Sequence, residues 1–385
     1  MSTKVQRRHV IYLSGFDPRG ASFYHRIYRT DSQRQAEING MTFSVGRRHK
    51  CSPVSHHWDI QSTSGEHETF TRYEFMAWDD IVRAHWPQGY AALLLATLKA
   101  NLAYVPSGTL AKVGRTSRPP FITGLYPLSF MPTALLLGAG ITWGVSALSM
   151  GLAGLVPAVL MGLGAGAATL ALTQRLGERI NVFWLLRLYA FAAHWVRDGV
   201  PELEQRLDRF AERVQSALDD SSNDEVLIVG HSVGAILAMS VTARVLKAGS
   251  AENRTENRLS LLTMGECIPL VSFLPGATDY RNDLERVGNS HERYWADFTA
   301  AMDGACFPLV NPVTASGLTQ AEGTAPHILS TRFHTLFTPE HYRRIRRNWY
   351  RMHFQYIMST DQQGLFDYFA ITAGAEKLEE RLAHD

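Results

Sequence analysis

Cysteine is scarce in this sequence of 385 residues, which contains only Cys51, Cys267 and Cys306. The three are odd in number, lie far apart and form no Cys-x-x-Cys pair, which argues against a disulfide framework and a zinc module. Unpaired thiols fit a reducing compartment better. The histidines near Cys51 are His49, His56 and His57. Their spacing matches no closed metal site, so we expect no bound metal and exposed histidines in a loop at a strand edge.

The chain also lacks a large excess of charge of either sign. It has 38 Lys and Arg residues and 36 Asp and Glu residues, a formal net charge of +2. This balance provides no bulk attraction to nucleic acid, and no nucleic-acid partner is predicted. The basic residues near the N-terminus are followed by no long apolar segment, so we expect no secretory signal.

Charge disappears completely from residues 121–173, which contain no Asp, Glu, Lys, Arg or His. Since a membrane-spanning helix needs about 20 apolar residues, this segment is long enough for two. Glycine and proline interrupt its middle, which predicts one helix around 130–150 and a second around 155–173. We therefore expect residues 121–175 to form a transmembrane hairpin in the lipid bilayer, the alternative being a buried soluble hairpin.

Two features of the sequence support the hairpin. Small residues four apart would let two helices approach closely, and there are two such pairs, Gly140 with Gly144 and Gly162 with Gly166. Both flanks are basic, with Lys112, Arg115 and Arg118 before the segment and Arg175, Arg179 and Arg187 after it. A two-helix hairpin returns the chain to the side that it left, and basic flanks favour the cytoplasm. We expect an integral membrane protein with both termini and the remaining chain in the cytoplasm.

A strand, a tight turn and a helix follow in order after the hairpin. The aliphatic run 226–229 is typical of a strand buried on both faces of a parallel sheet. It is followed by Gly230-His231-Ser232-Val233-Gly234 and then by an apolar helical segment. A serine on so tight a turn is held in a strained conformation, and the positions two before and two after it must be small. The helix behind Ser232 directs unpaired N–H groups toward the serine.

On this Gly-x-Ser-x-Gly motif and its strand and helix, the sequence resembles the α/β-hydrolase superfamily, in its serine esterase and lipase branch. The resemblance covers most of the chain apart from one insertion. It implies an α/β fold with a mostly parallel central sheet flanked by helices. Residues 1–120 and 176–385 would form the hydrolase domain, with the hairpin 121–175 inserted. It also implies a serine nucleophile followed in the chain by an acid and a histidine, with no metal and no organic cofactor.

The resemblance further implies an oxyanion hole made by two backbone N–H groups. Val233, directly after Ser232, would provide one. The short strand 10–13 is followed by a loop rich in turn-forming residues, and Phe16 or Asp17 stands where the other donor is expected.

The acid and the base are expected on loops at the carboxyl ends of later strands. Asp303 is favoured as the acid because it precedes Gly304 and follows a strand-like segment, whereas Asp297 lies within that segment. The remaining candidates for the acid are Asp279 and Asp283.

His334 is favoured as the base because it ends the last predicted strand, 327–333. His341 and His353 are the alternatives for the base. His341 stands in the first turn of a helix that begins at Thr338, and His353 is expected in the middle of the same helix. His231 precedes the nucleophile and is expected to point away from it.

The resulting expectation is a membrane-anchored serine hydrolase with the triad Ser232, Asp303 and His334. It would cleave lipophilic carboxylic esters, such as acylglycerols, phospholipids or other acyl esters, through an acyl-enzyme. Acyl transfer to an acceptor other than water would use the same residues. The alternative without catalysis is a membrane scaffold on an inactive hydrolase fold.

Overall fold

The computed structural model describes residues 4–249 and 258–383. Within them a nine-stranded sheet runs in the order β2-β4-β5-β1-β6-β7-β8-β9, with β3 paired to β4. The strands are β1 (Arg7–Leu13), β2 (Thr42–Val45), β3 (His49–Ser52), β4 (Ser55–Ser64), β5 (His67–Met76), β6 (Glu225–His231), β7 (Leu259–Met264), β8 (Tyr294–Thr299) and β9 (His327–Ser330).

The sheet is mixed. The neighbours from β5 through β1, β6, β7 and β8 to β9 are parallel, whereas β4 pairs antiparallel with β2, β3 and β5. The expected parallel sheet is therefore confirmed for this part of the fold only. Leu13 pairs with Gly230, and His231 pairs with Met264. The carboxyl ends of β1, β6 and β7 therefore lie at the same edge of the sheet, next to Ser232.

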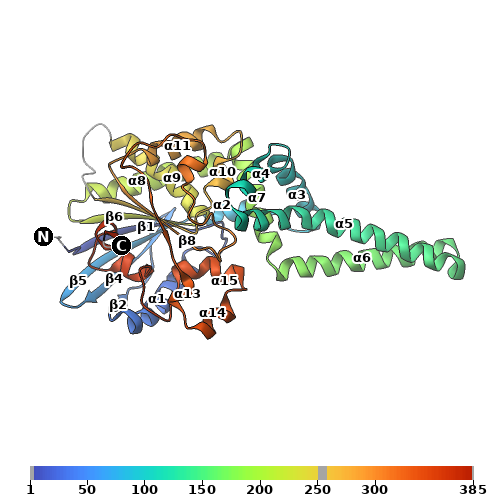
Figure 1. Ribbon diagram of the computed structural model, residues 1–385, viewed down its shortest axis with the longest axis horizontal. Coiled ribbons are helices and arrows are strands. Elements are labelled where there is room, and N and C mark those ends of the chain that lie inside the picture. The colour runs from blue at the N-terminus through green and yellow to red at the C-terminus, as the bar shows by residue number, and fades with distance from the viewer. Residues whose placement is uncertain (1–3, 250–257, 384–385) are drawn as a thin grey trace.

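Helices cover both faces of this sheet, as expected for an α/β fold (Figure 1). One face packs on α8 (Pro201–Asp219), α9 (Val233–Gly249) and α11 (Thr278–Gly288), and the other on α1 (Gly20–Asn39) and the C-terminal helices. Alternate residues of β1 pack against the two helical layers: Ile11 faces the layer of α8, α9 and α11, and Tyr12 faces the layer of α1 and the C-terminal helices. Such two-sided burial explains why the central strands read as continuous apolar runs.

The C-terminal part consists of short helices: α13 (Phe333–Leu336), α14 (Pro339–Ile345), α15 (Trp349–Phe354), η1 (Gln355–Ile357), α16 (Tyr368–Ala373) and α17 (Leu378–Leu382). The N-cap predicted at Thr338 is confirmed, because its side chain accepts a hydrogen bond from the His341 N–H. The single helix expected to follow it is wrong. The chain leaves the helix after Ile345, and Asn348 caps a new one by accepting from the Arg351 N–H.

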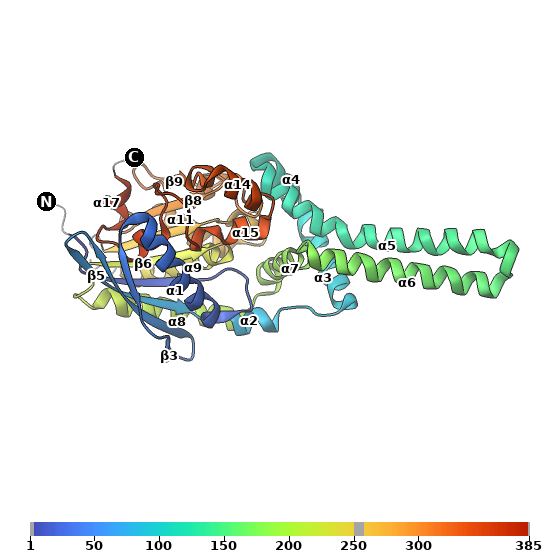
Figure 2. The ribbon, with the colours of Figure 1, turned by 90° about the horizontal axis from the view of Figure 1, so that it is seen from below.

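Two long helices leave the body of the protein side by side (Figures 1 and 2). They are α5 (Arg118–Ala153) and α6 (Leu155–Arg179), joined at Gly154, which has a φ of +77°. Both are long and apolar enough to cross a membrane, and only 6% and 17% of their most apolar stretches are buried. Leucines such as Leu148 and Leu152 are 84% and 94% exposed. This exposure contradicts a buried soluble hairpin.

The hairpin differs from the expectation in two details. Both helices extend beyond 130–150 and 155–173. Helix α5 begins earlier than expected, and its first part packs on the body through Thr123, Leu128 and Met131. The two helices approach closely at Gly162 and Gly166, as expected, and at Gly138 on α5. Gly140 and Gly144, the predicted partners, face open space instead.

The remaining helices near the hairpin are α2 (Asp79–Ala84), α3 (Tyr90–Tyr104), α4 (Thr109–Thr116) and α7 (Val182–Asp198), with the short α10 (Pro269–Ser272) and α12 (Pro312–Ala315) closer to the sheet. Helix α7 follows the hairpin directly and is mostly buried. Its side chains pack between the root of the hairpin and the carboxyl edge of the sheet, where they line the site described next.

Candidate active site

Ser232 occupies the turn between β6 and α9 in a conformation that few non-glycine residues adopt. Its φ is +60°, in the left-handed region. The Ser232 N–H donates to the Met264 carbonyl at 3.0 Å, and its carbonyl accepts from the Ala235 N–H at 2.9 Å. Backbone bonds to β7 and to the following helix thus hold the strained turn, and strain of this kind is concentrated at functional sites.

The chain passes Ser232 so closely that side chains are excluded at two positions. A Cβ at Gly234 would overlap the Leu13 carbonyl group, which is backbone and cannot move aside. A Cβ at Gly15 would lie 3.1 Å from Ser232 Cβ and 3.3 Å from its Oγ. Gly15, in the predicted oxyanion loop, therefore lies close to the serine side chain.

The structure brings Asp303 together with His353. Both side chains are almost fully buried, and the two carboxylate oxygens of Asp303 lie 2.9 and 3.0 Å from His353 Nδ1. The Ala305 N–H also donates to Asp303, at 3.0 Å. Burial by itself would raise the pKa of Asp303, but His353 and this N–H stabilise the carboxylate and hold its pKa below the usual value. An ionised carboxylate on Nδ1 leaves Nε2 as the nitrogen free for proton transfer.

His353 Nε2 is buried and has no hydrogen-bond partner among the described residues. A buried polar atom without a partner is costly and points to a role. The His231 ring supports His353 from the other side, because its Nε2 lies 2.7 Å from the His353 carbonyl oxygen and must donate to it. Burial, together with the nearby His353, lowers the pKa of His231 to about 3, so that it stays neutral. The expectation that His231 does not face the serine fits this contact.

His334, the histidine favoured from sequence, lies elsewhere. It is exposed on α13, where its ring contacts Tyr342, and Asp303 is paired with His353 instead. The predicted Asp303–His334 pair is therefore wrong. His341 pairs with Asp361 at 2.8 Å.

Among the described residues, none of the other candidate acids is paired with a histidine. Asp297, within β8 as expected, accepts from the Thr263 hydroxyl at 2.6 Å, and burial raises its pKa to about 7. Asp283 lies 3.6 Å from Arg244, and Asp279 is exposed on α11.

The two backbone donors expected for an oxyanion belong to Val233, directly after Ser232, and to Phe16, directly after Gly15, which lies close to the serine. Among the described residues, neither the Phe16 nor the Val233 N–H has an acceptor. The Phe16 carbonyl accepts from Trp184 Nε1 at 3.1 Å, and its ring packs between Trp86 and Phe191. Asp17, the alternative donor, ties the same loop to Arg19 and Tyr24 through its side chain.

Space for a ligand lies at the root of the hairpin. A hollow of about 590 Å³ is lined by His353, Trp184 and Tyr126, among others. A much smaller space of about 20 Å³ lies at Ser232 and is lined also by Cys267. The two share four lining residues, Thr123, Trp184, Leu185 and Ala305. The hollow therefore leads from the surface toward both His353 and Ser232.

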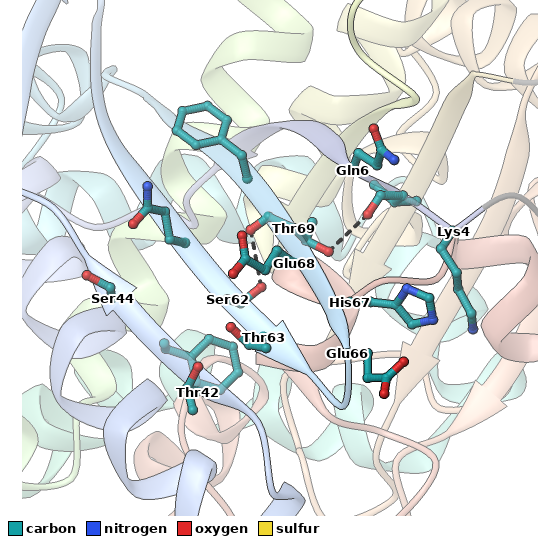
Figure 3. A pocket seen from close by; sticks show the side chains of 14 residues that line it. Lys4, Gln6, Thr42, Ser44, Ser62, Thr63, Glu66, His67, Glu68 and Thr69 are labelled. Atoms are coloured by element: carbon teal, nitrogen blue, oxygen red, sulfur yellow. Dashed lines mark hydrogen bonds between the residues drawn. The ribbon is translucent and has the colours of Figure 1, made fainter.

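A larger hollow, of about 770 Å³, lies at the opposite edge of the sheet (Figure 3). Its wall is formed by residues 4–6, which precede β1, and by β2, β4 and β5, with polar side chains such as Ser62 and Thr69. Since Arg7 pairs with Phe70, this is the amino end of β1 and β5, far from the carboxyl ends that meet at Ser232. The hollow is remote from the serine.

The histidines near Cys51 lie on the β3–β4 hairpin rather than in a loop. Cys51 Sγ lies 2.8 Å from His57 Nδ1, and His56 pairs with Arg48. Over residues 4–249 and 258–383, no three His, Cys, Asp or Glu side chains gather in a way that could hold a metal ion.

Comparisons of this chain with protein-family models, with curated proteins and with solved structures found no match.

Proposed function

We propose that this protein is a membrane-anchored serine hydrolase of the α/β-hydrolase type, with the triad Ser232, His353 and Asp303. The observation that carries the proposal is the buried Asp303–His353 pair. The Nε2 of His353 has no partner among the described residues, and His353 lines the hollow that adjoins the space at Ser232. Chain order supports it, because serine, acid and histidine follow β6, β8 and β9 in the order of that superfamily. His353 takes the role that the sequence assigned to His334.

The reaction is cleavage of a carboxylic ester in two steps. Ser232 Oγ attacks the carbonyl carbon while its proton passes to His353 Nε2, and the Val233 and Phe16 N–H groups stabilise the oxyanion. The ester C–O bond then breaks, His353 gives the proton to the leaving alcohol, and water hydrolyses the acyl-enzyme by the same route. Ser232 and Cys267 line the same small space.

The first test is covalent labelling. A fluorophosphonate probe should label the folded protein on the peptide that contains Ser232, since an activated serine attacks the phosphorus atom whereas an ordinary buried serine does not. Heat-denatured protein serves as the control and should remain unlabelled. Folded protein that resists the probe and hydrolyses no ester would contradict the proposal and leave an inactive scaffold. Product assays with added alcohols distinguish hydrolysis from acyl transfer.

A second expectation is that α5 and α6 span the membrane, with the site and both termini on the cytoplasmic side. Their exposed apolar surface and basic flanks support this topology. The protein should stay in the membrane pellet after alkaline carbonate extraction. A reporter protein that functions only in the cytoplasm should be active when it is fused to the C-terminus, and one that functions only outside the cytoplasm should be inactive. Release by carbonate would refute the spanning helices, and reporter activity on the opposite side would refute the orientation.

A further inference from the structure

Two arginines line the 590 Å³ hollow, and the proposed chemistry does not use them. Arg179 ends α6, and Arg347 lies in the turn between α14 and α15. They come from segments far apart in the chain, yet they line the same space as His353. Both are exposed.

Neither of these two arginines has an acidic partner among the described residues. Two other arginines near the hollow are already engaged. Arg19 pairs with Asp17, and Arg187 donates to the Pro87 carbonyl and stacks on Trp86, 4.7 Å from the ring centre. Arg179 and Arg347 therefore retain donors for a ligand. Planar guanidinium groups suit the oxygens of a phosphate, which they bind through paired hydrogen bonds.

The opening of the hollow lies at the depth of lipid headgroups. A span of about 20 residues crosses a hydrocarbon core of about 30 Å, so a helix that enters at Leu155 reaches the opposite boundary just before Arg175 and Arg179. Exposed apolar side chains of the body lie beside this boundary: Leu95, Leu98 and Leu102 of α3, and Ile122 and Leu125 of α5. Helix α3 lies next to the root of the hairpin (Figure 2). Such a surface settles into the interface of a bilayer.

The lining of the hollow contains both apolar and polar side chains. Apolar and aromatic residues form much of its wall, among them Ile122, Tyr126, Leu185 and Trp349. His353 is part of its lining, and Ala305 lies where it adjoins the space at Ser232. Its volume falls within the range of small-molecule sites, about 300–1,000 Å³. The site thus combines cations at the membrane surface, an apolar wall and the proposed base.

From this arrangement we propose that Arg179 and Arg347 bind the phosphate of a phospholipid whose acyl ester reaches Ser232. In a glycerophospholipid the phosphate and an acyl ester occupy neighbouring carbons of the glycerol, so one molecule can contact both groups. The reaction consumes water and yields a fatty acid and a lysophospholipid, and neutral acylglycerols are disfavoured. This inference rests on the hydrolase function proposed above.

The test compares two lipids with identical acyl chains, phosphatidylglycerol and diacylglycerol, at equal mole fraction in mixed micelles of a nonionic detergent. Wild-type protein should show the higher kcat/KM on phosphatidylglycerol. Since a charge-assisted contact contributes about tenfold, the double variant Arg179→Gln/Arg347→Gln should lower the ratio of the two kcat/KM values by up to about 100-fold. An equal or higher wild-type kcat/KM on diacylglycerol would overturn the proposal.

The matched control is Arg175→Gln/Arg343→Gln. It removes two exposed arginines, one from α6 and one from α14, that do not line the hollow. It loses the same charge and should keep the wild-type ratio. If it lowers the ratio as much as the test pair does, attraction to the anionic surface accounts for the effect and the phosphate site is refuted.

A binding measurement separates this inference from the proposed function. In native mass spectrometry, detergent-solubilised Ser232→Ala should retain more bound phosphatidylglycerol than diacylglycerol. Adding Arg179→Gln and Arg347→Gln to this variant should abolish the preference. If no ester is cleaved but the preference persists, the hydrolase function fails and the phosphate site stands. If short soluble esters are cleaved and no preference for phosphatidylglycerol exists, the phosphate site fails and the hydrolase stands.

Discussion

Ser232→Ala is expected to lower ester hydrolysis by about 10⁴-fold or more and to abolish labelling by a fluorophosphonate, because the nucleophile itself is removed. The geometry that supports this expectation is local. The backbone holds Ser232 at a φ of +60° close to Gly15, and the N–H groups of Phe16 and Val233 have no acceptor among the described residues. Activity that remains would come from the oxyanion site and from substrate binding alone.

The control for this variant is Ser240→Ala, which removes a buried serine from α9 at a distance from the turn. Both proteins should unfold at similar temperatures, and Ser240→Ala should keep its activity and its labelling. Full hydrolysis by Ser232→Ala would remove the serine from the mechanism. Equal loss in both variants would attribute the effect to damage in α9 rather than to the loss of a nucleophile.

The turn at Ser232 could be predicted because its determinants are contiguous in the chain. An aliphatic strand, a Gly-x-Ser-x-Gly turn and an apolar helix specify one another through local geometry, and the structure places β6, Ser232 and α9 accordingly. The hairpin was predictable for a similar reason, since the loss of charge over residues 121–173 is a property of composition. The approach of Gly138, rather than Gly140, depends on the rotation of α5 about its axis, which composition does not determine.

The pairing of His353 with Asp303 was not predicted, because the position of His353 depends on a break in a helix. A continuous helix from Thr338 would place His353 in its middle, where a histidine is usually a packed core residue. The chain instead leaves the helix after Ile345, Asn348 caps α15, and η1 follows Phe354, so His353 lies near the end of a short helix against Asp303. Asn348 was the available signal, because asparagine is a favoured N-cap. The antiparallel end of the sheet was missed because pairing direction is set by contacts between distant strands.

His353→Ala is expected to cost about as much activity as Ser232→Ala, roughly 10⁴-fold or more, since removal of either group disables the same proton transfer. His334→Ala should stay within about twofold of wild type, because surface substitutions away from special features have small effects. Asp303→Asn should lower the rate by about 10⁴-fold, because the imidazole is then held in the wrong tautomer. Turnover of a soluble ester, measured at equal folded fraction, ranks the three variants.

Loss of the His353 ring also leaves the Asp303 carboxylate buried without its partner, which destabilises the fold by about 3–5 kcal/mol. His353→Gln separates stability from catalysis, because its amide can donate to Asp303 while it cannot accept a proton at neutral pH. It should remain folded and inactive, with a thermal midpoint closer to wild type than that of His353→Ala. Near-normal turnover in folded His353→Gln, together with a loss of activity in His334→Ala, would return the role of base to His334 and require the Asp303–His353 pair to be purely structural.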